Sequence, residues 1–215
     1  MKNSNIDNVF IYWLYFVSLI LISIYILESF GFISGLFKED ISYISSLIVS
    51  IFIFYLFRGG YYLFFLRNAI DNLGRNDLRL NNNIFVDILD EYKVSSSNNS
   101  NKKPFQEELK LRLYEIVDNG FFVADILLKL GIVGTVIGFI IMLSSLSTID
   151  EMNLAKMNNL LLSMSSGMKV ALYTTLSGLI CSILLTIQNN FFENKINVFI
   201  SKIMSLDNNE KKDKN

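Results

Sequence analysis

The chain has 215 residues, of which 52% are hydrophobic and only 18% are charged, and its formal net charge is −1. A soluble domain usually carries about 25% charged residues. The apolar residues here are gathered in blocks long enough to cross a bilayer, which argues against an ordinary soluble globule. The near-zero net charge argues against a nucleic-acid-binding protein, because such proteins carry a strong basic excess.

The chemistry available to the chain is restricted, because it contains one cysteine, Cys181, and no histidine. A lone cysteine cannot form an intrachain disulfide, and no Cys/His metal set is possible. Mechanisms that need a histidine base are excluded, and no other nucleophile–base pair is visible. We therefore expect no enzyme, no bound metal and no cofactor.

Four apolar blocks predict four transmembrane helices in an all-α membrane protein. About 20 apolar residues are enough to cross the hydrocarbon core of a bilayer, and each block comes close to or exceeds that length. The blocks cover residues 9–30, 41–66, 126–146 and 170–189.

The first two blocks each have an alternative interpretation. The first contains one charged residue, Glu28, and only Lys2 is basic before it. A retained span is therefore favoured over a signal peptide, which has a shorter apolar core and a basic start. The second block is interrupted by Arg58-Gly59-Gly60, so a tilted or re-entrant helix is the alternative to a full span.

Lysine and arginine are distributed unevenly among the connections. Residues 67–125 carry eight of them and the tail from Phe191 carries five, whereas residues 31–40 and 147–168 carry one each. The positive-inside rule then predicts that both termini and residues 67–125 lie in the cytoplasm.

The cytoplasmic parts are predicted to be helical extensions of the last two spans. Residues 94–103 have the composition of a flexible linker, and Pro104 lies where a helix could start. Apolar residues then recur at steps of three and four, both before the third span and after the fourth, so the two extensions are expected to pack together. The two stripes are Leu109, Leu113, Ile116, Val117 and Phe121, and Phe192, Ile196, Phe199, Ile200 and Ile203.

These expectations divide the chain into four parts. They are an N-terminal pair of spans (1–66), a cytoplasmic segment (67–125), a second pair of spans (126–190), and a helical extension with a polar, disordered tail (191–215).

The last two spans carry small and hydroxyl residues in a regular pattern. The third contains L-G-I-V-G-T-V-I-G at 130–138, and the fourth contains G-M-K-V-A-L-Y-T-T-L-S-G-L at 167–179. Glycines four residues apart form a groove that lets helices approach closely, and hydroxyls in lipid often bond back to their own helix. Packing alone would explain either motif taken singly. The predicted packing residues are Gly131, Gly134, Gly138 and Gly178.

Taken together, the two motifs resemble those of the MotA/TolQ/ExbB proton-channel family. In that family the penultimate span carries an L-G-x-x-G-T-V-x-G-like run, and the last span carries G-[IM]-x-x-A-L-x-x-T-x-x-G-L. Both runs occur here in that order, separated by a short connection on the predicted outer side. The resemblance covers residues 126–190 and the overall topology.

The resemblance implies a multi-pass protein of the bacterial inner membrane that forms a homopentamer in the lipid bilayer. The pentamer would surround two copies of a single-span partner of the MotB, TolR or ExbD kind, whose membrane helix carries a titrating Asp. Ion flow past that Asp would rotate the pentamer around the partner. The translocated ion would be H⁺, with Na⁺ as the alternative.

The resemblance also implies which residues line the ion pathway, because the family's two pore threonines correspond to Thr135 and Thr175. Neither motif-bearing span has a carboxylate within it; Asp125 lies at the cytoplasmic edge. The titrating group must then come from the partner, and a threonine hydroxyl can donate to its ionised form or accept from its protonated form.

Several neighbouring residues are further candidates. Thr174 is rotated about 100° from Thr175 and is expected to face a neighbouring subunit or to pack helices. Lys129 and Lys169 are expected to snorkel to the two interfaces. Further candidates for positions near the pore are Ser144, Ser145 and Ser177.

The branch of the family and one functional alternative stay open. Two spans before the cytoplasmic segment resemble the flagellar stator subunit, whereas TolQ and ExbB have one. The prolines that these relatives carry near their last spans are missing, since none follows Pro104. The alternative function is a non-conducting membrane scaffold whose glycines and threonines only pack helices. A solute transporter is disfavoured because no inverted repeat is visible.

Overall fold

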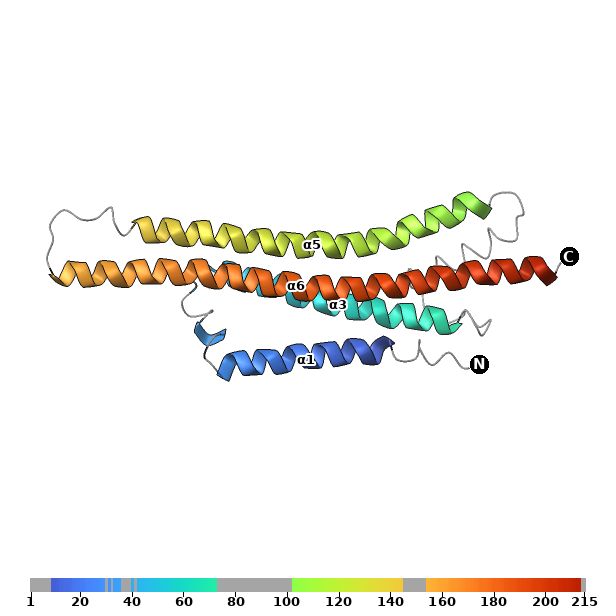
Figure 1. The fold of residues 1–215 in the computed structure, drawn as a ribbon, viewed down its shortest axis with the longest axis horizontal. Helices are drawn as coiled ribbons and strands as arrows, with labels where there is room; N and C mark the ends of the chain where they lie inside the picture. The colour runs from blue at the N-terminus through green and yellow to red at the C-terminus, as the bar shows by residue number, and fades with distance from the viewer. Residues whose placement is uncertain are drawn as a thin grey trace. The chain divides into compact units, whose positions relative to one another are not determined.

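The computed structural model describes residues 9–29, 31, 33–35, 40, 42–72, 102–144 and 154–213, and these residues contain helices and no strand. The helices are α1 (Val9–Ser29), α3 (Ile44–Asn72), α5 (Lys102–Ser144) and α6 (Leu154–Asp213), as Figure 1 shows. They contribute to two compact units, each built from parts of all four helices. We call residues 1–16, 57–120 and 187–215 the terminal unit, and residues 17–56 and 121–186 the motif unit.

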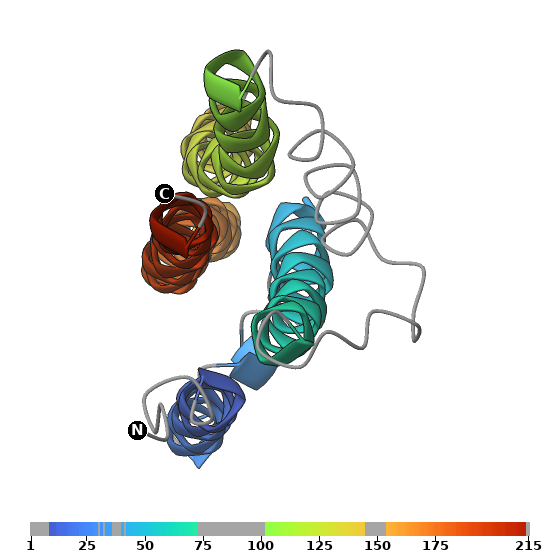
Figure 2. The same ribbon diagram turned by 90° about the vertical axis from the view of Figure 1, so that its right-hand side faces the viewer.

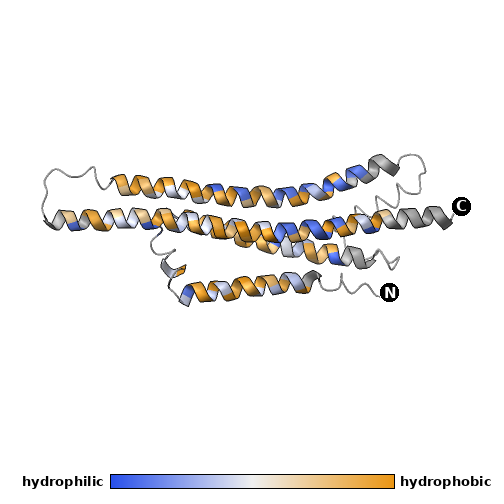
Figure 3. Cartoon of the chain, in the orientation of Figure 1, coloured by the Kyte–Doolittle hydropathy of each residue, from blue (hydrophilic) through white to orange (hydrophobic). Residues whose placement is uncertain are grey.

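Each of the four helices contains a stretch that is long and apolar enough to cross a membrane. In α1 only 6% of this stretch is buried, against 39% in α6, so α1 keeps nearly all of its apolar surface available for lipid. The stretches are Ile11–Ser29, Ile44–Arg67, Lys110–Ser144 and Leu160–Met204. The prediction of four helices that are long and apolar enough to cross a membrane is confirmed. Figure 3 shows that hydrophilic residues become frequent in the terminal-unit parts of α5 and α6.

Helix α3 runs unbroken through Arg58-Gly59-Gly60, so the interruption expected by the re-entrant alternative is not present. Both glycines lie where another side chain comes too close for a Cβ atom. A Cβ at Gly59 would overlap the amide of Gln188 in α6, and one at Gly60 would overlap the indole of Trp13 in α1. Each glycine costs about 1 kcal/mol of helix propensity, and close packing in the terminal unit offsets this cost.

The start of α3 differs by three residues from the predicted start of the second span. Asp40 is buried, and its carboxylate accepts hydrogen bonds from the backbone N–H groups of Ser42 (3.0 Å) and Ser45 (2.7 Å). Such a bond satisfies an N–H group of the first helical turn that has no partner within the helix. Tyr43 has a φ of 57°, which no residue inside an α-helix adopts. The helix therefore begins at Ile44.

Helices α5 and α6 are each continuous, as expected for spans with extensions. Helix α5 has 43 residues and includes Gly120 without a break. It begins at Lys102, so Pro104 lies in its first turn and residues 94–101 of the predicted linker fall outside the described residues. Helix α6 has 60 residues and continues to Asp213. The tail predicted to be disordered is thus helical that far, which its lysines and glutamate favour.

Within the terminal unit, α5 and α6 lie side by side along their predicted apolar stripes (Figures 1 and 2). Leu113 and Val117 of α5 are buried, and Tyr114 donates a hydrogen bond to Asn197 Oδ1 of α6 at 2.5 Å. All five α6 stripe residues are at most 5% exposed, namely Phe192, Ile196, Phe199, Ile200 and Ile203. On α5, Ile116 is half-buried, and the side chain of Leu109 lies outside the described residues. Phe121, the last residue of the predicted α5 stripe, belongs to the motif unit and is half-buried.

Burial of the α6 stripe predicts how alanine substitutions change the free energy of unfolding. Ile196 is 0% exposed, so Ile196→Ala should lower the free energy of unfolding by about 2–5 kcal/mol through lost burial and the cavity left behind. Val198, two residues away, is 44% exposed, and Val198→Ala should change it by less than about 0.5 kcal/mol. Denaturant titration of the purified protein in detergent measures both values. Equal effects would show that the stripe is not a packed core.

Candidate functional site

In the motif unit, α5 and α6 approach so closely that backbone meets backbone. A Cβ atom at Gly178 would lie 2.8 Å from Gly131 Cα, and one at Gly138 would lie 2.6 Å from Ala171 N. Real Cβ atoms essentially never come within 3.0 Å of such atoms. The two helices can therefore keep this separation only while these positions are glycine.

The contact continues at both sides of these pairs in antiparallel order. Gly134 faces the side chain of Thr174, and a Cβ at Gly167 would lie 2.7 Å from the backbone nitrogen of Met142. The four predicted packing glycines all lie at this contact. Gly167 and Ala171 also belong to this contact. They lie four and three residues apart from each other and from Thr174 on the face of α6 that also carries Gly178, and this spacing could have identified them from the sequence.

Thr175 lies at the edge of this contact, and its hydroxyl spans both helices. Its Oγ1 is 3.2 Å from the carbonyl oxygen of Gly131 in α5 and 3.2 Å from that of Ala171 in its own helix. A hydroxyl has one proton to donate and two lone pairs to accept with. The single proton is therefore shared between two equally distant acceptors, and the side chain is only half-buried.

Thr135 is also half-buried, and its Oγ1 donates to the carbonyl oxygen of Ile132 at 2.5 Å, one turn back in α5. Gly134 and Thr174 face each other, and the next residue along each helix is Thr135 in α5 and Thr175 in α6. In two antiparallel right-handed helices, one step beyond facing residues turns both side chains to the same side of the pair. The two threonines expected in the pathway therefore share one side of the α5–α6 pair.

The structure differs from the expectation that Thr174 faces a neighbouring subunit. Thr174 is 0% exposed within the single chain and packs against Gly134. Its hydroxyl donates to the carbonyl oxygens of Val170 (2.9 Å) and Ala171 (3.1 Å). These contacts fit the alternative role for Thr174, which is helix packing.

The candidate serines do not join the two threonines. Ser177 is buried, donates to the carbonyl oxygen of Thr174 at 2.9 Å, and lies about 200° round the helix from Thr175. Ser144 is exposed and donates to Ile141 at 2.8 Å. Ser145 lies outside the described residues.

Two further hydroxyl residues share the face of Thr175 and were not singled out from the sequence. Ser182 and Thr186 follow Thr175 by seven and eleven residues, spacings that return to the same helix face within about 20°. Both are half-buried, and Thr186 donates to the carbonyl oxygen of Ser182 at 2.8 Å. The spacing of seven and four was the signal that would have found them.

The motif-unit parts of α5 and α6 contain one described carboxylate, Asp125. It forms an ion pair with Lys129 at 2.5 Å, one turn further along α5, and both side chains are more than half exposed. Among the described residues, no group of three or more His, Cys, Asp or Glu side chains could hold a metal ion. The side of the helix pair that carries Thr135 and Thr175 thus presents hydroxyls without an acid of its own.

Residues 122–205 match the sequence model of the MotA/TolQ/ExbB proton channel family. The family predicted from the two motifs is confirmed for this segment, which contains the glycine contact, Thr135, Thr175 and the start of the α6 extension. Searches of curated proteins and of solved structures found no match.

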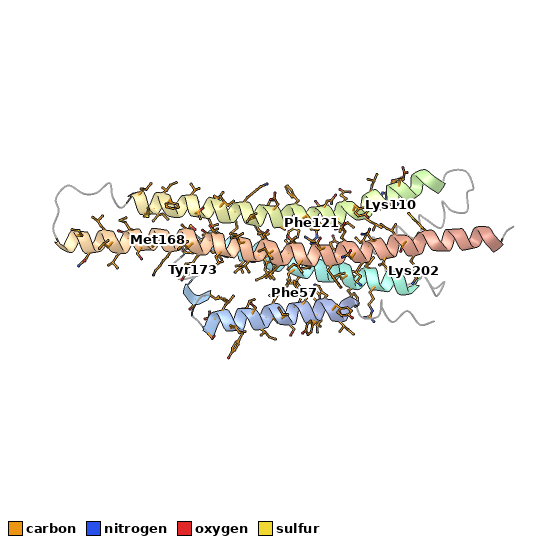
Figure 4. The ribbon with its side chains drawn as sticks, viewed as in Figure 1. Phe57, Lys110, Phe121, Met168, Tyr173 and Lys202 are labelled. Carbon is orange, nitrogen blue, oxygen red and sulfur yellow. The ribbon has the colours of Figure 1, made fainter. Side chains whose placement is uncertain are left out.

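The MotA/TolQ/ExbB family consists of membrane subunits of the proton-channel type, and residues 122–205 are similar to its members. Such subunits work with a MotB-, TolR- or ExbD-type partner in a membrane complex. The matched segment does not distinguish the branches of the family. It does include every residue named above at the glycine contact between α5 and α6. Figure 4 labels Met168 and Tyr173 on this part of α6.

The glycine contact predicts a graded response to alanine. A Cβ would lie 2.6 Å from its nearest atom at Gly138 and 2.8 Å at Gly178, but 3.2 Å at Gly131. Gly138→Ala and Gly178→Ala should therefore lower thermal stability clearly, although alanine raises helix propensity by about 1 kcal/mol. Gly131→Ala should be the mildest of the three. Thermal unfolding in detergent measures the order, and three equal or stabilising effects would contradict the close contact.

Proposed function

We propose that the chain is the pore-forming subunit of an ion-driven motor in the bacterial inner membrane, coupling ion flow past a partner Asp to rotation or force. The observation that carries the proposal is the placement of Thr135 and Thr175 on one side of the α5–α6 pair, inside the matched family segment. H⁺ is the proposed ion, with Na⁺ as the alternative.

The chemistry of this side fits a partner that brings the charge. A carboxylate in the membrane is costly, so it marks function where it occurs, and neither α5 nor α6 supplies one beside these threonines. The Thr175 hydroxyl can turn from either of its two carbonyl acceptors to an approaching carboxylate. It can donate to the ionised acid or accept from the protonated acid, which lowers the cost of both states.

The proposed assembly is a homopentamer around two copies of a single-span partner, with both termini and residues 67–125 in the cytoplasm. Large apolar side chains on the outer faces of α5 and α6 support further helix contacts in the membrane. They include Val136, Phe139 and Ile140 of α5, and Leu172 and Ile183 of α6, all at least half exposed. Crossing 100 mV releases about 2.3 kcal/mol per proton, so work on a large partner requires many coupled steps.

Thr175→Val tests the pathway because it removes the hydroxyl and keeps the side-chain shape. In proteoliposomes holding the complex with its single-span partner, it should lower ion-gradient-driven flux about 10- to 100-fold, as expected for losing a hydrogen bond to a charged group. Thr175→Ser should retain most of the flux, and both variants should still assemble. A pH-sensitive dye reports the flux.

Two outcomes would contradict the proposal. Unchanged flux and function in Thr175→Val and Thr135→Val would favour the non-conducting scaffold, in which these residues only pack helices. Co-expression with a neighbouring-gene single-span protein that carries a membrane Asp should give a 5:2 complex by native mass spectrometry. A chain that stays monomeric with every such protein would remove the basis for the motor.

A further inference from the structure

A cavity of about 90 Å³ lies between α1 and α6 in the terminal unit. Its surface is almost entirely apolar, and most of the residues that line it are aromatic. The cavity is partly open, so a molecule outside the protein can enter it. The lining residues are Tyr12, Trp13 and Phe16 of α1, and Ile187, Gln188 and Phe191 of α6.

Two of the lining side chains are held in place by glycines of α3. A Cβ atom at Gly60 would overlap the indole of Trp13, and one at Gly59 would overlap the amide of Gln188. Both side chains therefore pack directly on the α3 backbone. Neither can turn away from α3 to close the space between α1 and α6 without losing this contact.

The apolar lining restricts what can occupy the cavity. One water needs about 10–15 Å³ and about two to four polar partners, so the space would hold several waters but offers them almost no partners. An empty space would forfeit van der Waals contacts along its walls. An apolar chain makes those contacts, and acyl chains are at hand because Ile11–Ser29 and Leu160–Met204 are both apolar enough to cross a membrane.

A cation lies beside one wall of the cavity. Lys195 Nζ is 5.2 Å from the centroid of the Phe191 ring, and Phe191 is one of the lining residues. The electron-rich face of an aromatic ring attracts a cation at this distance, which keeps the ammonium group close to the cavity. Its positive charge is complementary to a phosphate group, a common ligand of lysine.

The lysine and the lining residues follow one another in the order of the parts of a phospholipid. Helix α1 enters the motif unit after Phe16, whereas α6 leaves that unit before Ile187, so the two helices are antiparallel. Lys195 lies nearest the end of the spans. Tyr12 and Phe191 come next, and Phe16 and Ile187 lie about one turn deeper. A charged headgroup followed by an apolar chain has the same order.

We propose that the cavity between α1 and α6 binds an acyl chain of an anionic phospholipid from the cytoplasmic leaflet, with the headgroup phosphate on Lys195. The leaflet follows from the positive-inside distribution of lysine and arginine, and anionic lipids give this leaflet its negative surface potential. The bound lipid adds contacts to α1, of whose span only 6% is buried. The site goes beyond the proposed motor and does not require that the complex conduct ions.

Trp13 is the only tryptophan in the chain, so its fluorescence reports directly on the cavity. The full-length chain is reconstituted in phosphatidylcholine vesicles that contain a small fraction of lipid brominated on its acyl chain, because bromine quenches tryptophan at contact. The brominated lipid is either phosphatidylglycerol or phosphatidylcholine. Brominated phosphatidylglycerol should quench Trp13 with about fivefold higher apparent affinity, the preference expected from one lysine near an anionic lipid.

A pair of lysine variants tests the headgroup contact. Lys195→Gln should reduce the fivefold preference to about one, because it removes the charge beside the cavity. Lys110→Gln makes the same change on α5, which contributes no residue to the cavity, and should keep the preference. An equal loss of preference in both variants would overturn the placement of the headgroup on Lys195.

A pair of isoleucine variants tests the acyl-chain contact. Ile187→Phe should fill part of the cavity and weaken quenching by both brominated lipids. Ile183→Phe makes the same change one turn away on α6, at a position with similar exposure (56% against 49%), and should leave quenching unchanged. Should Ile187→Phe fail to fold, Lys195→Gln still decides, because it changes only a partly exposed charge.

Two results with the unchanged chain would overturn the site. Equal apparent affinities for the two brominated lipids would show only ordinary contact with the surrounding bilayer. No quenching by either lipid would show that protein, such as a second copy of the chain, covers the cavity.

Discussion

The contact on which the rest of the motif unit depends is the backbone-to-backbone approach of α5 and α6. Glycine at Gly131, Gly138 and Gly178 removes the side chains that would hold the helices apart. Once the helices touch, the carbonyl oxygen of Gly131 comes within reach of the Thr175 hydroxyl. In lipid, where no hydrophobic force drives helices together, such close van der Waals packing is a main source of association. The contact therefore supplies both the cohesion of the pair and the position of its hydroxyls.

Adjacent threonines in α6 have separate tasks because of this contact. Thr174 points into the contact and is 0% exposed, so its hydroxyl is confined to carbonyls of its own helix. Thr175 lies one residue further round and reaches across to α5 while staying half-buried. A rotation of about 100° thus separates a side chain that holds the helices from one that another protein can reach.

The sequence predicted the spans, the continuous helices and the glycines at the contact, because all of these follow from local composition and periodicity. It did not predict the face of Thr174, since that depends on which α5 residue stands opposite. It also marked Arg58-Gly59-Gly60 as an interruption, although both glycines make room for Gln188 and Trp13. These partners are far away in the chain, so no local pattern could reveal them.

The antiparallel contact also restricts how this protein can change over evolution. Gly131 pairs with Gly178, and Met142 pairs with Gly167, so a step of eleven residues along α5 is matched by a step of eleven residues along α6. A step of eleven residues makes just over three whole helical turns. Inserting one residue into either helix would rotate everything beyond it by about 100° and set bulky side chains against the opposite backbone. Positions between these pairs that face away from the contact can accept substitutions, but neither helix can change its length without the other.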